Sequence, residues 1–441
     1  MALDKMDKIV SLAKRRGFIF QSSEIYGGIG GFWDYGHLGV ELKKNVERFW
    51  WHHVVKLRKD VVGIDASIVM HPRVWEASGH VEEFHDVMVD CKKCKRRFRR
   101  DHVQGEKCPE CGGELGEPKK FNLMLRTNVG AMEDSSSVAF LRPETAQAIF
   151  ADFETVRGSA RLKVPFGIAQ VGTSFRNEIT PRFFTFRSRE FEQMEMEYFV
   201  HPSDADKWYE YWVNARHQWY IDLGVKPERL RLRPHEKEEL AHYAKACTDV
   251  EYEFPFGWQE LEGIANRTDF DLRRHEEYSG KDLKYFDEAT KEKYIPWVIE
   301  TSAGLTRSVL TVLCDAYDED VAPTAETEEG KRDEEERVVL RFNPKIAPIQ
   351  VAVFPLSKKL AEPAQKVEAD LRRYFATFYD DAGSIGRRYR RMDEAGTPYC
   401  ITFDFDSLED HKVTVRDRDA MTQDRIGFDA LRPYLEERLL F

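Results

Sequence analysis

The sequence predicts an α+β protein in which an antiparallel β-sheet domain with helices carries a small cysteine-bearing insertion and is followed by a smaller α/β domain. Three observations predict this organisation. Residues 121–199 have mostly strand patterning. Two C-x-x-C pairs interrupt the chain between residues 88 and 120. After residue 341, strand and helix patterns alternate, which is typical of a small α/β domain.

The composition is that of a globular protein. With 441 residues, 42% of them hydrophobic and 33% charged, the chain can form two to four domains with buried cores. No apolar run in the sequence approaches the roughly 20 residues of a membrane span. The first 18 residues also lack the features of a signal or transit peptide. We therefore expect a cytoplasmic protein without membrane association.

The first elements are expected to be two helices and a strand. Residues 1–18 place apolar side chains on one face of a short amphipathic helix, and residues 39–57 do the same for a longer helix. Residues 61–72 then have the pattern of a strand that ends at Pro72. The inward-facing residues of the first helix are expected to be Leu3, Met6, Ile9, Val10 and Ala13.

The middle of the chain mixes helical and strand patterns. Residues 203–290 are polar and rich in helical patterning, which predicts a helix-rich insertion in the sheet domain. Strand patterns return near residues 257–264 and 294–301, and residues 305–317 have the pattern of an apolar helix. The sheet domain as a whole is assigned to residues 1–340.

A strongly acidic segment lies between the two domains. Residues 318–337 hold ten acidic and three basic side chains, so they contribute −7 of the net charge of −11. Because this segment has no apolar period, it is expected to be a solvated loop. The rest of the chain is mildly acidic, and local basic patches can still steer a nucleic acid. Residues 341–441 form the predicted C-terminal domain.

Two C-x-x-C pairs, Cys91–Cys94 and Cys108–Cys111, predict a structural zinc site. Each pair offers two thiolates from one tight turn, and four thiolates complete a tetrahedron around Zn²⁺ with no position left for water. Four reduced cysteines on a loop are the alternative. The basic run KRRFRRDH between the pairs is either a solvated face or a contact for a phosphate backbone or a small anion.

The segment SFRNEITPRFFTFRSREFEQMEMEYF, residues 174–199, predicts a β-hairpin with one functional face. Alternation indicates a half-buried strand that begins near Arg187, with Met194, Met196 and Tyr198 facing the core. ATP together with an amino group would match phosphates to arginines, a ring to a phenylalanine and a cation to carboxylates. A polar outer face of a sheet is the alternative. The residues expected on the functional face are Arg176, Glu178, Arg187, Phe191 and Glu195.

The same hairpin resembles motif 2 of the class II aminoacyl-tRNA synthetases. GVELKKNVERFWW and IDASIVMHP resemble motif 1, the helix and strand of the dimer interface, and ETSAGLTRSVL resembles motif 3. One departure is that Thr306 stands where an acidic residue usually precedes the motif 3 arginine, here Arg307. Nearly the whole chain is similar to the dimeric glycyl-tRNA synthetase family, through SSEIYGGIGGFWDYGHLGVELK, EASGHVEEFHD, LRPETAQAIF and GRRYRRMDEAGTPYCITFDFD.

This resemblance implies an enzyme that attaches glycine to tRNA(Gly) in two steps through a glycyl-adenylate made from ATP. It implies a class II catalytic domain over residues 1–340, with a zinc-binding insertion at 88–120, and an anticodon-binding domain over 341–441. It also implies catalytic Mg²⁺, structural Zn²⁺ and a homodimer. Two alternatives remain, a class II synthetase for another small amino acid and a catalytically inactive accessory protein that binds nucleic acid.

The resemblance also assigns roles at the ATP site. Arg176 is expected to bind the α-phosphate and the glycine carboxylate, Arg187 the outer phosphates, and Phe191 to stack on adenine. Arg307 covers the other adenine face or the γ-phosphate, and Glu260 is the expected magnesium ligand. The implied catalytic residues are Arg176, Glu178 and Arg307; because these and Glu260 are all present, an inactive relative is disfavoured. The implied ATP-binding residues are Arg176, Asn177, Glu178, Phe186, Arg187, Ser188, Arg189, Glu190, Phe191, Glu260, Leu261, Gly304, Leu305, Thr306 and Arg307.

Selectivity for glycine is expected to come from exclusion, because every other amino acid is larger and a larger rival needs no second sieve. By resemblance, Glu144, Glu300 and Ser302 surround the ammonium group, with Arg99 nearby. The implied glycine-binding residues are Arg99, Glu144, Phe191, Glu192, Gln193, Met194, Glu195, Glu300, Thr301, Ser302, Ala303 and Gly304.

The C-terminal run GRRYRRMDE places four arginines around one tyrosine. Unpaired bases are read by stacking and by edge hydrogen bonds, with arginines on the phosphates. A solvated basic helix is the alternative. The residues implied to contact the tRNA anticodon are Arg387, Arg388, Tyr389, Arg390 and Arg391.

Overall fold

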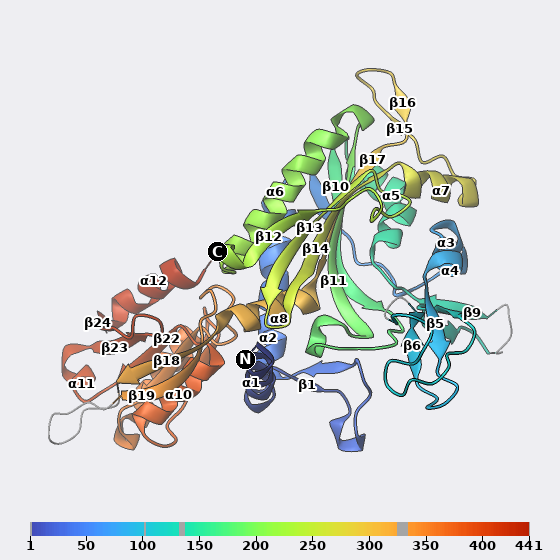
Figure 1. Ribbon diagram of the computed structural model, residues 1–441. Helices are drawn as coiled ribbons and strands as arrows, with labels where there is room; N and C mark the ends of the chain where they lie inside the picture. The colour runs from blue at the N-terminus through green and yellow to red at the C-terminus, as the bar shows by residue number, and fades with distance from the viewer. Residues whose placement is uncertain (1, 101–102, 132–136, 324–333, 441) are drawn as a thin grey trace.

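The computed structural model describes residues 2–100, 103–131, 137–323 and 334–440. A large body is built on one β-sheet, and a smaller body at the C-terminal end lies to one side of it (Figure 1). The predicted α+β fold is confirmed, since the sheet of the large body is almost entirely antiparallel and the small body is mixed α/β.

The large body is organised by a sheet with the strand order β12-β13-β14-β17-β11-β10-β3. Each neighbouring pair is antiparallel except β10 and β3, which are parallel. The expected hairpin therefore sits at the centre of the sheet, beside β17. The bounds are β3 (Val61–Gly63), β10 (Phe166–Phe175), β11 (Glu190–Val200), β12 (Leu230–Pro234), β13 (Ala246–Phe254), β14 (Gly257–Thr268) and β17 (Trp297–Gly304).

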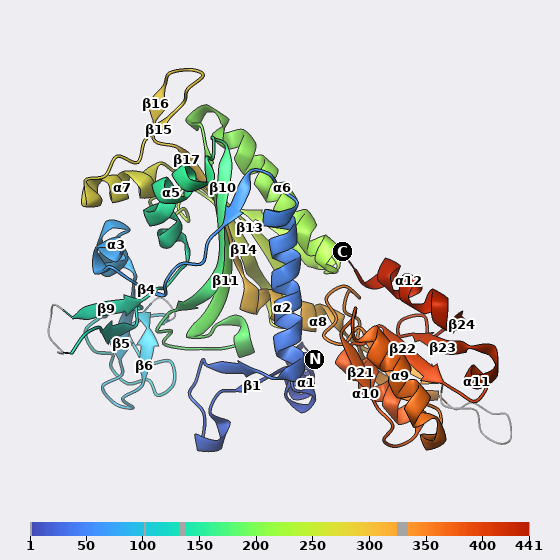
Figure 2. The same ribbon diagram turned by 180° about the vertical axis from the view of Figure 1, so that it is seen from behind.

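Helices cover both faces of this sheet. One buried cluster packs α1, α2, α6 and α8 against Met194 and Met196 of β11, and Figure 2 shows α2 running across this face. A second cluster packs α5 and α7 against the other face through Phe166 and Phe199. The predicted N-terminal, second and apolar helices are confirmed. The bounds are α1 (Ala2–Arg16), α2 (His37–Trp51), continued by a π-helical turn (His52–Lys56), α5 (Ala146–Ala160), α6 (Ala205–Leu223), α7 (Phe270–Ser279) and α8 (Leu305–Ala316).

The segment 203–290 is not a helix-rich insertion. It begins with α6, but β12, β13 and β14 follow and belong to the central sheet. β13 and much of β14 are buried on both faces, so neither shows the alternation by which a half-buried strand is recognised. The hairpin strands are also shorter than expected, since β10 ends at Phe175 and β11 begins at Glu190.

Shorter elements surround the central sheet. Small three-stranded sheets are formed by β6-β5-β7, in the cysteine-bearing insertion, and by β4-β9-β8. The bounds are β1 (Ile19–Gln21), β2 (Trp33–Tyr35), β4 (Val69–Met70), α3 (Pro72–Ala77), α4 (His80–Glu83), β5 (His85–Asp90), β6 (Arg97–Arg99), β7 (Lys119–Asn122), β8 (Arg126–Asn128), β9 (Val138–Leu141), β15 (Tyr285–Phe286) and β16 (Lys293–Tyr294).

The acidic segment 318–337 is not a simple solvated loop. Its two ends belong to an antiparallel hairpin of β18 (Tyr317–Pro323) and β19 (Glu334–Leu340). Residues 324–333 lie outside the described residues. Asp318 and Asp320 of β18 pair with Arg337 and Arg341, and Arg337 also contacts Asp393 of the C-terminal body. These described side chains of the acidic segment are therefore used in ion pairs.

The C-terminal body has the predicted alternation of strands and helices. Its sheet has the order β21-β20-β22-β23-β24, in which β20 is parallel to both of its neighbours and the remaining pairs are antiparallel. The bounds are β20 (Val351–Pro355), α9 (Ala361–Leu371), β21 (Thr377–Tyr379), α10 (Ile385–Ala395), β22 (Tyr399–Phe403), α11 (Ser407–Asp410), β23 (Lys412–Asp417), β24 (Gln423–Gly427) and α12 (Phe428–Leu439).

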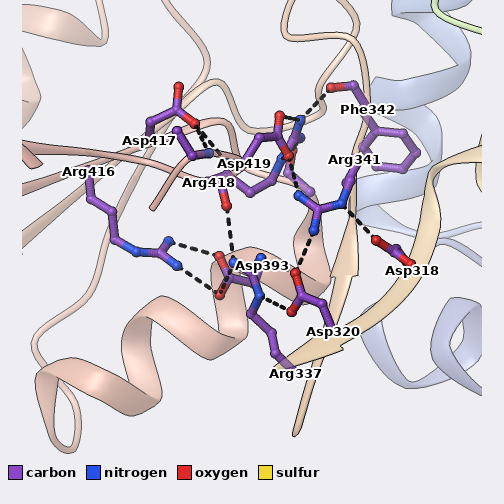
Figure 3. A network of polar contacts seen from close by, with 12 residues as sticks. Asp318, Asp320, Arg337, Arg341, Phe342, Asp393, Arg416, Asp417, Arg418 and Asp419 are labelled. Atoms are coloured by element: carbon purple, nitrogen blue, oxygen red, sulfur yellow. Dashed lines mark hydrogen bonds and ion pairs between the residues drawn. The ribbon is translucent and has the colours of Figure 1, made fainter. Parts of the chain in front are cut away.

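Buried ion pairs join the β18–β19 hairpin to this body (Figure 3). Asp393, on α10, is fully buried and accepts hydrogen bonds from Arg416 at 2.9 and 3.3 Å. Arg337, on β19, donates to Asp393 at 3.4 Å and to Asp320 of β18 at 2.7 Å. Because Arg337 lies on β19 and Asp393 on α10, this network ties the hairpin to the C-terminal body.

Apolar packing continues across the same boundary. The rings of Phe18 and Phe342 lie with centroids 6.0 Å apart. Gly396 ends α10 with φ +77°, and a Cβ on it would lie 2.3 Å from the Phe342 ring. This position therefore requires glycine for two reasons, its left-handed backbone and the close approach of Phe342. One buried cluster includes residues from both bodies, so they share part of their core.

Candidate active site

Two adjoining hollows open on the central sheet beside the β10–β11 hairpin. The first has a volume of about 120 Å³ and the second of about 260 Å³. Arg176, Gln193, Glu260 and Ser302 line both hollows. A ligand that reaches from one hollow into the other therefore passes Arg176, which follows β10 directly.

The first hollow combines arginines with aromatic rings. The Arg307 guanidinium lies 4.5 Å from the Phe186 ring centroid, and its Nη1 donates to the Glu260 side chain at 3.3 Å. The Arg176 guanidinium lies 5.3 Å from the Phe191 ring centroid. Flat rings and planar guanidinium groups of this kind suit a heterocyclic base that carries phosphates.

Positive charge is concentrated at one end of the first hollow. Burial lowers the pKa of Arg187, and the neighbouring Arg182, Arg99 and Arg307 lower it further, although the Glu178 carboxylate acts in the opposite direction. Arginines repel one another when no anion lies between them, so this arrangement is suited to a polyanion such as a triphosphate. Arg99 thus contributes to the field at Arg187.

The second hollow is lined by buried carboxylates. Glu195 accepts hydrogen bonds from the Thr145 backbone N–H at 3.0 Å, from Ser302 Oγ at 2.6 Å and from Gln193 Nε2 at 3.1 Å. Glu144 contacts His80 at 3.3 Å. Burial alone would raise the pKa of Glu144, but the contact with His80 holds this pKa well below its usual range. Such a group of carboxylates is suited to an ammonium ion.

Glu300, in the same hollow, is held by Arg267. Arg267 donates to Glu300 at 2.6 Å and forms two hydrogen bonds with Asp271, at 2.7 and 2.9 Å. Burial, assisted by the negative charges of Glu195 and Glu144, raises the pKa of Glu300 to about 7 even though Arg267 acts in the opposite direction. Glu300 therefore titrates near neutral pH.

The structure brings most of the expected ATP-site residues together. The side chains of Asn177, Arg189, Glu190 and Leu305 are exceptions, because they do not line the first hollow. Arg189 instead donates to the carbonyl oxygens of Glu178 and Gly30, at 2.9 and 2.8 Å. The expected residues that do line it are Arg176, Glu178, Phe186, Arg187, Ser188, Phe191, Glu260, Leu261, Gly304, Thr306 and Arg307.

Strand alternation divides the expected glycine-site residues. Gln193 and Glu195 of β11, and Glu300 and Ser302 of β17, line the second hollow, as does Glu144. On each of these two strands, the residues that alternate with the lining residues point to the opposite face of the sheet. On that face, Met194 is 0% exposed and lies in the core. The expected residues whose side chains do not line it are Arg99, Phe191, Glu192, Met194, Thr301, Ala303 and Gly304, although Phe191 and Gly304 line the first hollow.

The prediction that the β11 strand is half-buried is wrong. Glu195 and Glu197 are 2% and 0% exposed, because α5 and the loop before it cover the face that carries them. The sequence did not indicate Thr145, which donates to Glu195, Arg267, which holds Glu300, or Gln147, which donates to Glu144. Arg267, near the end of β14, and Asp271, in the first turn of α7, are four residues apart, and this spacing was a signal for their ion pair.

The four clustered cysteines fit a zinc ion. The sulfur atoms of Cys91 and Cys111 lie 3.5 Å apart, and those of Cys94 and Cys108 lie 3.7 Å apart. A tetrahedron with Zn–S bonds of about 2.3 Å has sulfur atoms about 3.8 Å apart. All seven cysteines are free thiols in the structure. The four Sγ atoms are therefore already arranged as a zinc site requires.

The basic helix α10 makes more contacts within its own domain than its sequence suggested. Arg388 is 4% exposed and donates to the Pro355 carbonyl oxygen at 2.6 Å. Tyr389 bonds Thr402 at 2.6 Å and packs on Phe354. The Arg388 side chain is thus used inside the domain, and Tyr389 is half-buried, while a contact of these two residues with the anticodon stays a prediction.

The other expected anticodon residues differ in their surroundings. Arg390 donates to Asp393 at 3.1 Å, and Arg391 donates to the Ala382 carbonyl oxygen at 2.6 Å. Arg387 is exposed. An anticodon contact through α10 would therefore rest mainly on Arg387. Separately, no helix among the residues that the structure describes is long and apolar enough to cross a membrane.

Comparison with protein-family models gives two matches. Residues 131–317 match the tRNA synthetase class II core domain (G, H, P, S and T). Residues 350–438 match the anticodon binding domain. The first match includes the hairpin and both hollows, and the second covers the C-terminal body.

Curated relatives match along nearly the whole chain. A glycine--tRNA ligase of Treponema denticola is 57% identical over 429 residues, which are 96% of this chain and 94% of that protein. Proteins of the same name from Borreliella burgdorferi and Thermobifida fusca are 54% and 53% identical, each over 99% of this chain and 98% of the relative. Among solved structures, a chain described as the RNA binding domain of a threonyl-tRNA synthetase from Cryptosporidium parvum matches with a TM-score of 0.70 over 98% of both chains. Its identity of 16% makes this a likeness of fold alone.

Proposed function

The chain belongs to the glycine--tRNA ligase family, and from this premise we propose that the first hollow binds ATP and the second binds glycine. The observation that carries the proposal is the position of Arg176, which lines both hollows at their junction. In glycyl-adenylate formation, the glycine carboxylate and the α-phosphate of ATP must meet at one place. A guanidinium at that place can bind both groups.

The reaction proceeds in two steps. A carboxylate oxygen of glycine attacks the α-phosphorus of ATP in line, which forms glycyl-adenylate and releases pyrophosphate. A hydroxyl of the terminal ribose of tRNA then attacks the glycyl carbonyl and releases AMP. Arg176 stabilises charge on the equatorial α-phosphate oxygens, while Arg187 and Arg307 hold the outer phosphates. Most of the catalysis is thus positioning and charge stabilisation.

Magnesium is used with ATP by class II synthetases, and Glu260 is the residue that we assign to it. Its side chain is about half exposed, at 49%, and lies where the two hollows meet. Hard cations prefer carboxylate oxygens, and a bound Mg²⁺ would neutralise phosphate charge there. In the protein alone, Arg307 pairs with Glu260 at 3.3 Å and would turn towards the phosphates when ATP binds.

Recognition of glycine is assigned to carboxylates on both sides of the ammonium group. Glu144 and Glu300 supply negative charge, and the Ser302 hydroxyl orients Glu195. A side chain on a larger amino acid would desolvate these carboxylates without replacing their hydrogen bonds. Larger amino acids are therefore excluded by the shape of the hollow and also by charged groups that must stay solvated or paired.

The test of the function is ATP–pyrophosphate exchange with a panel of amino acids. Glycine is expected to support exchange, while alanine and serine should support it at least about 100-fold less well, which corresponds to roughly 3 kcal/mol of discrimination. Exchange supported equally by alanine would favour a synthetase for another small amino acid. Absence of exchange with every amino acid would favour an inactive relative.

Glycine binding should depend on pH through Glu300. Because burial raises the pKa of Glu300 to about 7, the carboxylate is mostly ionised at pH 8 and mostly protonated at pH 6. If the ionised form binds the ammonium, the glycine KM should be about tenfold higher at pH 6 than at pH 8. Steady-state exchange at both pH values measures this. Glu300→Gln should bind glycine weakly at both, and a wild-type KM that does not change with pH would contradict the assignment.

The two faces of β11 should respond differently to mutation. Phe191→Ala is expected to raise the apparent Kd of ATP about 5- to 150-fold, because base–aromatic stacking contributes about 1–3 kcal/mol. Met194→Ala, on the opposite face, should lower the free energy of unfolding by about 2–5 kcal/mol through a cavity, since Met194 is fully buried. ATP titration and thermal melting of both variants separate these effects. Weakened ATP binding in Met194→Ala with normal binding in Phe191→Ala would reverse the assignment.

We also propose that the four clustered cysteines hold one structural zinc ion. Cys94→Ser is expected to lose this zinc and to destabilise the insertion, because structural zinc binding is coupled to folding. Elemental analysis of reduced protein and limited proteolysis of residues 88–120 provide the measurements. Zinc-free wild-type protein that resists proteolysis as well as zinc-loaded protein would contradict this prediction.

The same premise leads us to propose tRNA(Gly) as the macromolecular partner, bound through the C-terminal body, and a cytoplasmic location. A homodimer is proposed on a structural observation as well. Ile25 and Tyr26 are 88% and 87% exposed, and Ile29 lies exposed in the same loop. Adjacent exposed apolar side chains of this size are typical of an interface. Light scattering of the purified protein distinguishes a dimer from a monomer.

A further inference from the structure

A second group of metal-binding side chains lies on the wall of the second hollow. His235, Cys247 and Asp249 each offer a ligand atom, and these atoms all lie within 4.8 Å of one another. His235 Nε2 is 2.8 Å from one carboxylate oxygen of Asp249, and the Cys247 thiol donates to the other at 4.0 Å. All three line the hollow, and none has a role in the reaction derived above.

Two paired strands position these three side chains. Cys247 and Asp249 are two residues apart on β13, so they project from the same face of the strand. His235 directly follows β12, and its backbone N–H donates to the Cys247 carbonyl oxygen at 2.9 Å. The three ligands are thus set by the pairing of β12 with β13 (Figure 1) and not by a free loop.

The neighbouring strand leaves space in front of them. On β14, Gly263 is opposite Asp249 and Ala265 is opposite Cys247, so the facing side chains are a hydrogen atom and a methyl group. A Cβ at Gly263 would lie 3.8 Å from Asp249 Oδ1 and 3.9 Å from Glu260 Oε1. An ion held between the three side chains would therefore not clash with a large side chain of β14, and carboxylate oxygen atoms would lie near it.

We propose that His235, Cys247 and Asp249 form a second zinc site, with three protein ligands and a fourth position open to the second hollow. One imidazole, one thiolate and one carboxylate are the donor types that zinc combines in proteins. The thiolate and imidazole select zinc over magnesium, which prefers oxygen ligands. The site thus differs from the four-cysteine cluster, in which no coordination position is open.

A zinc ion bound here would act on glycine. Glu300 and Ser302 line the same hollow, so the ion would add positive charge near the place assigned to the glycine ammonium. Like charges repel, and the repulsion is strong where water is excluded. Bound zinc should therefore raise the glycine KM about tenfold. This consequence rests on the proposed glycine site, whereas the metal binding itself does not.

The experiment measures zinc and cobalt binding by the full-length, reduced protein. Zinc titration of wild-type protein should reach two ions per chain. Cys247→Ser and His235→Ala should each reach one, while Cys94→Ser, the matched control, should lose the other ion and retain this one. With Co²⁺ in place of zinc, absorption from the Cys247 thiolate should disappear in Cys247→Ser. A millimolar excess of Mg²⁺ should not displace the second ion. Thermal melting checks that each variant is folded.

Saturation of the wild type at one ion would overturn the site, as would a second ion that persists when Cys247 and His235 are both replaced. Exchange kinetics with one and with two zinc ions per chain test the consequence, the four-cysteine site being loaded in both cases. Two bound ions with an unchanged glycine KM would overturn the effect on glycine and leave the metal site standing. Failure of the proposed function would instead remove glycine-dependent exchange from wild-type protein that carries only the four-cysteine zinc.

Discussion

Replacing Arg176 with alanine is expected to slow adenylate formation by about 10²- to 10³-fold, the effect of removing one preorganised donor from developing charge. Arg176 lines both hollows, and its Nε donates to the Pro143 carbonyl oxygen at 3.0 Å, which fixes its direction. Because its charge meets negative charge that grows on the α-phosphate, the loss should appear in the rate at saturating ATP and glycine. Single-turnover formation of glycyl-adenylate is the measurement.

A surface arginine provides the control for this variant. Arg273, on α7, has a side chain that is 57% exposed, and it pairs with Asp269, the residue just before that helix. Arg273→Ala should therefore leave adenylate formation within about twofold of wild type. Arg176→Lys keeps the charge but loses the planar fork, so an intermediate rate is expected. A normal rate at saturation in Arg176→Ala, with only the KM values raised, would remove Arg176 from the chemical step.

Replacing Asp393 with alanine is expected to lower the free energy of unfolding by about 3–5 kcal/mol, the cost of removing one partner from a buried ion pair. Asp393 is 0% exposed and accepts hydrogen bonds from Arg416 and Arg337 (Figure 3). It also accepts one from Arg390. Of these, Arg416 and Arg337 are buried as well. Loss of the carboxylate leaves their positive charges close together in a region that water does not reach. Urea unfolding is the measurement.

The control for Asp393 is an exposed ion pair in the same body. Glu362 and Lys366 pair at 2.8 Å with side chains that are 81% and 73% exposed. Glu362→Ala should cost at most about 0.5 kcal/mol, as exposed helix pairs do. Because Asp393 also docks α10 on the β18–β19 hairpin, Asp393→Ala should reduce tRNA charging more than pyrophosphate exchange. Equal stability of the Asp393→Ala and Glu362→Ala variants would show that the network does not hold the hairpin to the C-terminal body.

Part of the site could be predicted from the sequence because it depends on residues that are close together in the chain. The two C-x-x-C pairs each set their own turn, so the cysteines were found from spacing. The helix before β3 and the helix after β17 were found because apolar residues repeat along their buried faces. The residues of the first hollow were indicated by resemblance, and most of them do converge.

Other features depended on neighbours that are distant in the chain. Glu195 belongs to a strand that alternates, yet both faces of that strand are buried, because α5 and Thr145 cover the second one. β13 was missed for a related reason, since burial on both faces removes the alternation that marks a strand. In α10, Arg388 and Tyr389 look like surface residues in sequence but face the interior.

The sequence by itself determined the family, the two pairs of clustered cysteines and the set of arginines and carboxylates, because each of these depends on residue type and short spacing. Only the tertiary structure decided which alternate residues of β11 and β17 face the hollow, that Arg267 holds Glu300, and that Arg176 stands between the two hollows. It also placed His235 beside Cys247 and Asp249. These features arise when strands that are far apart in the chain pair in one register, and register is set by the packing of whole faces.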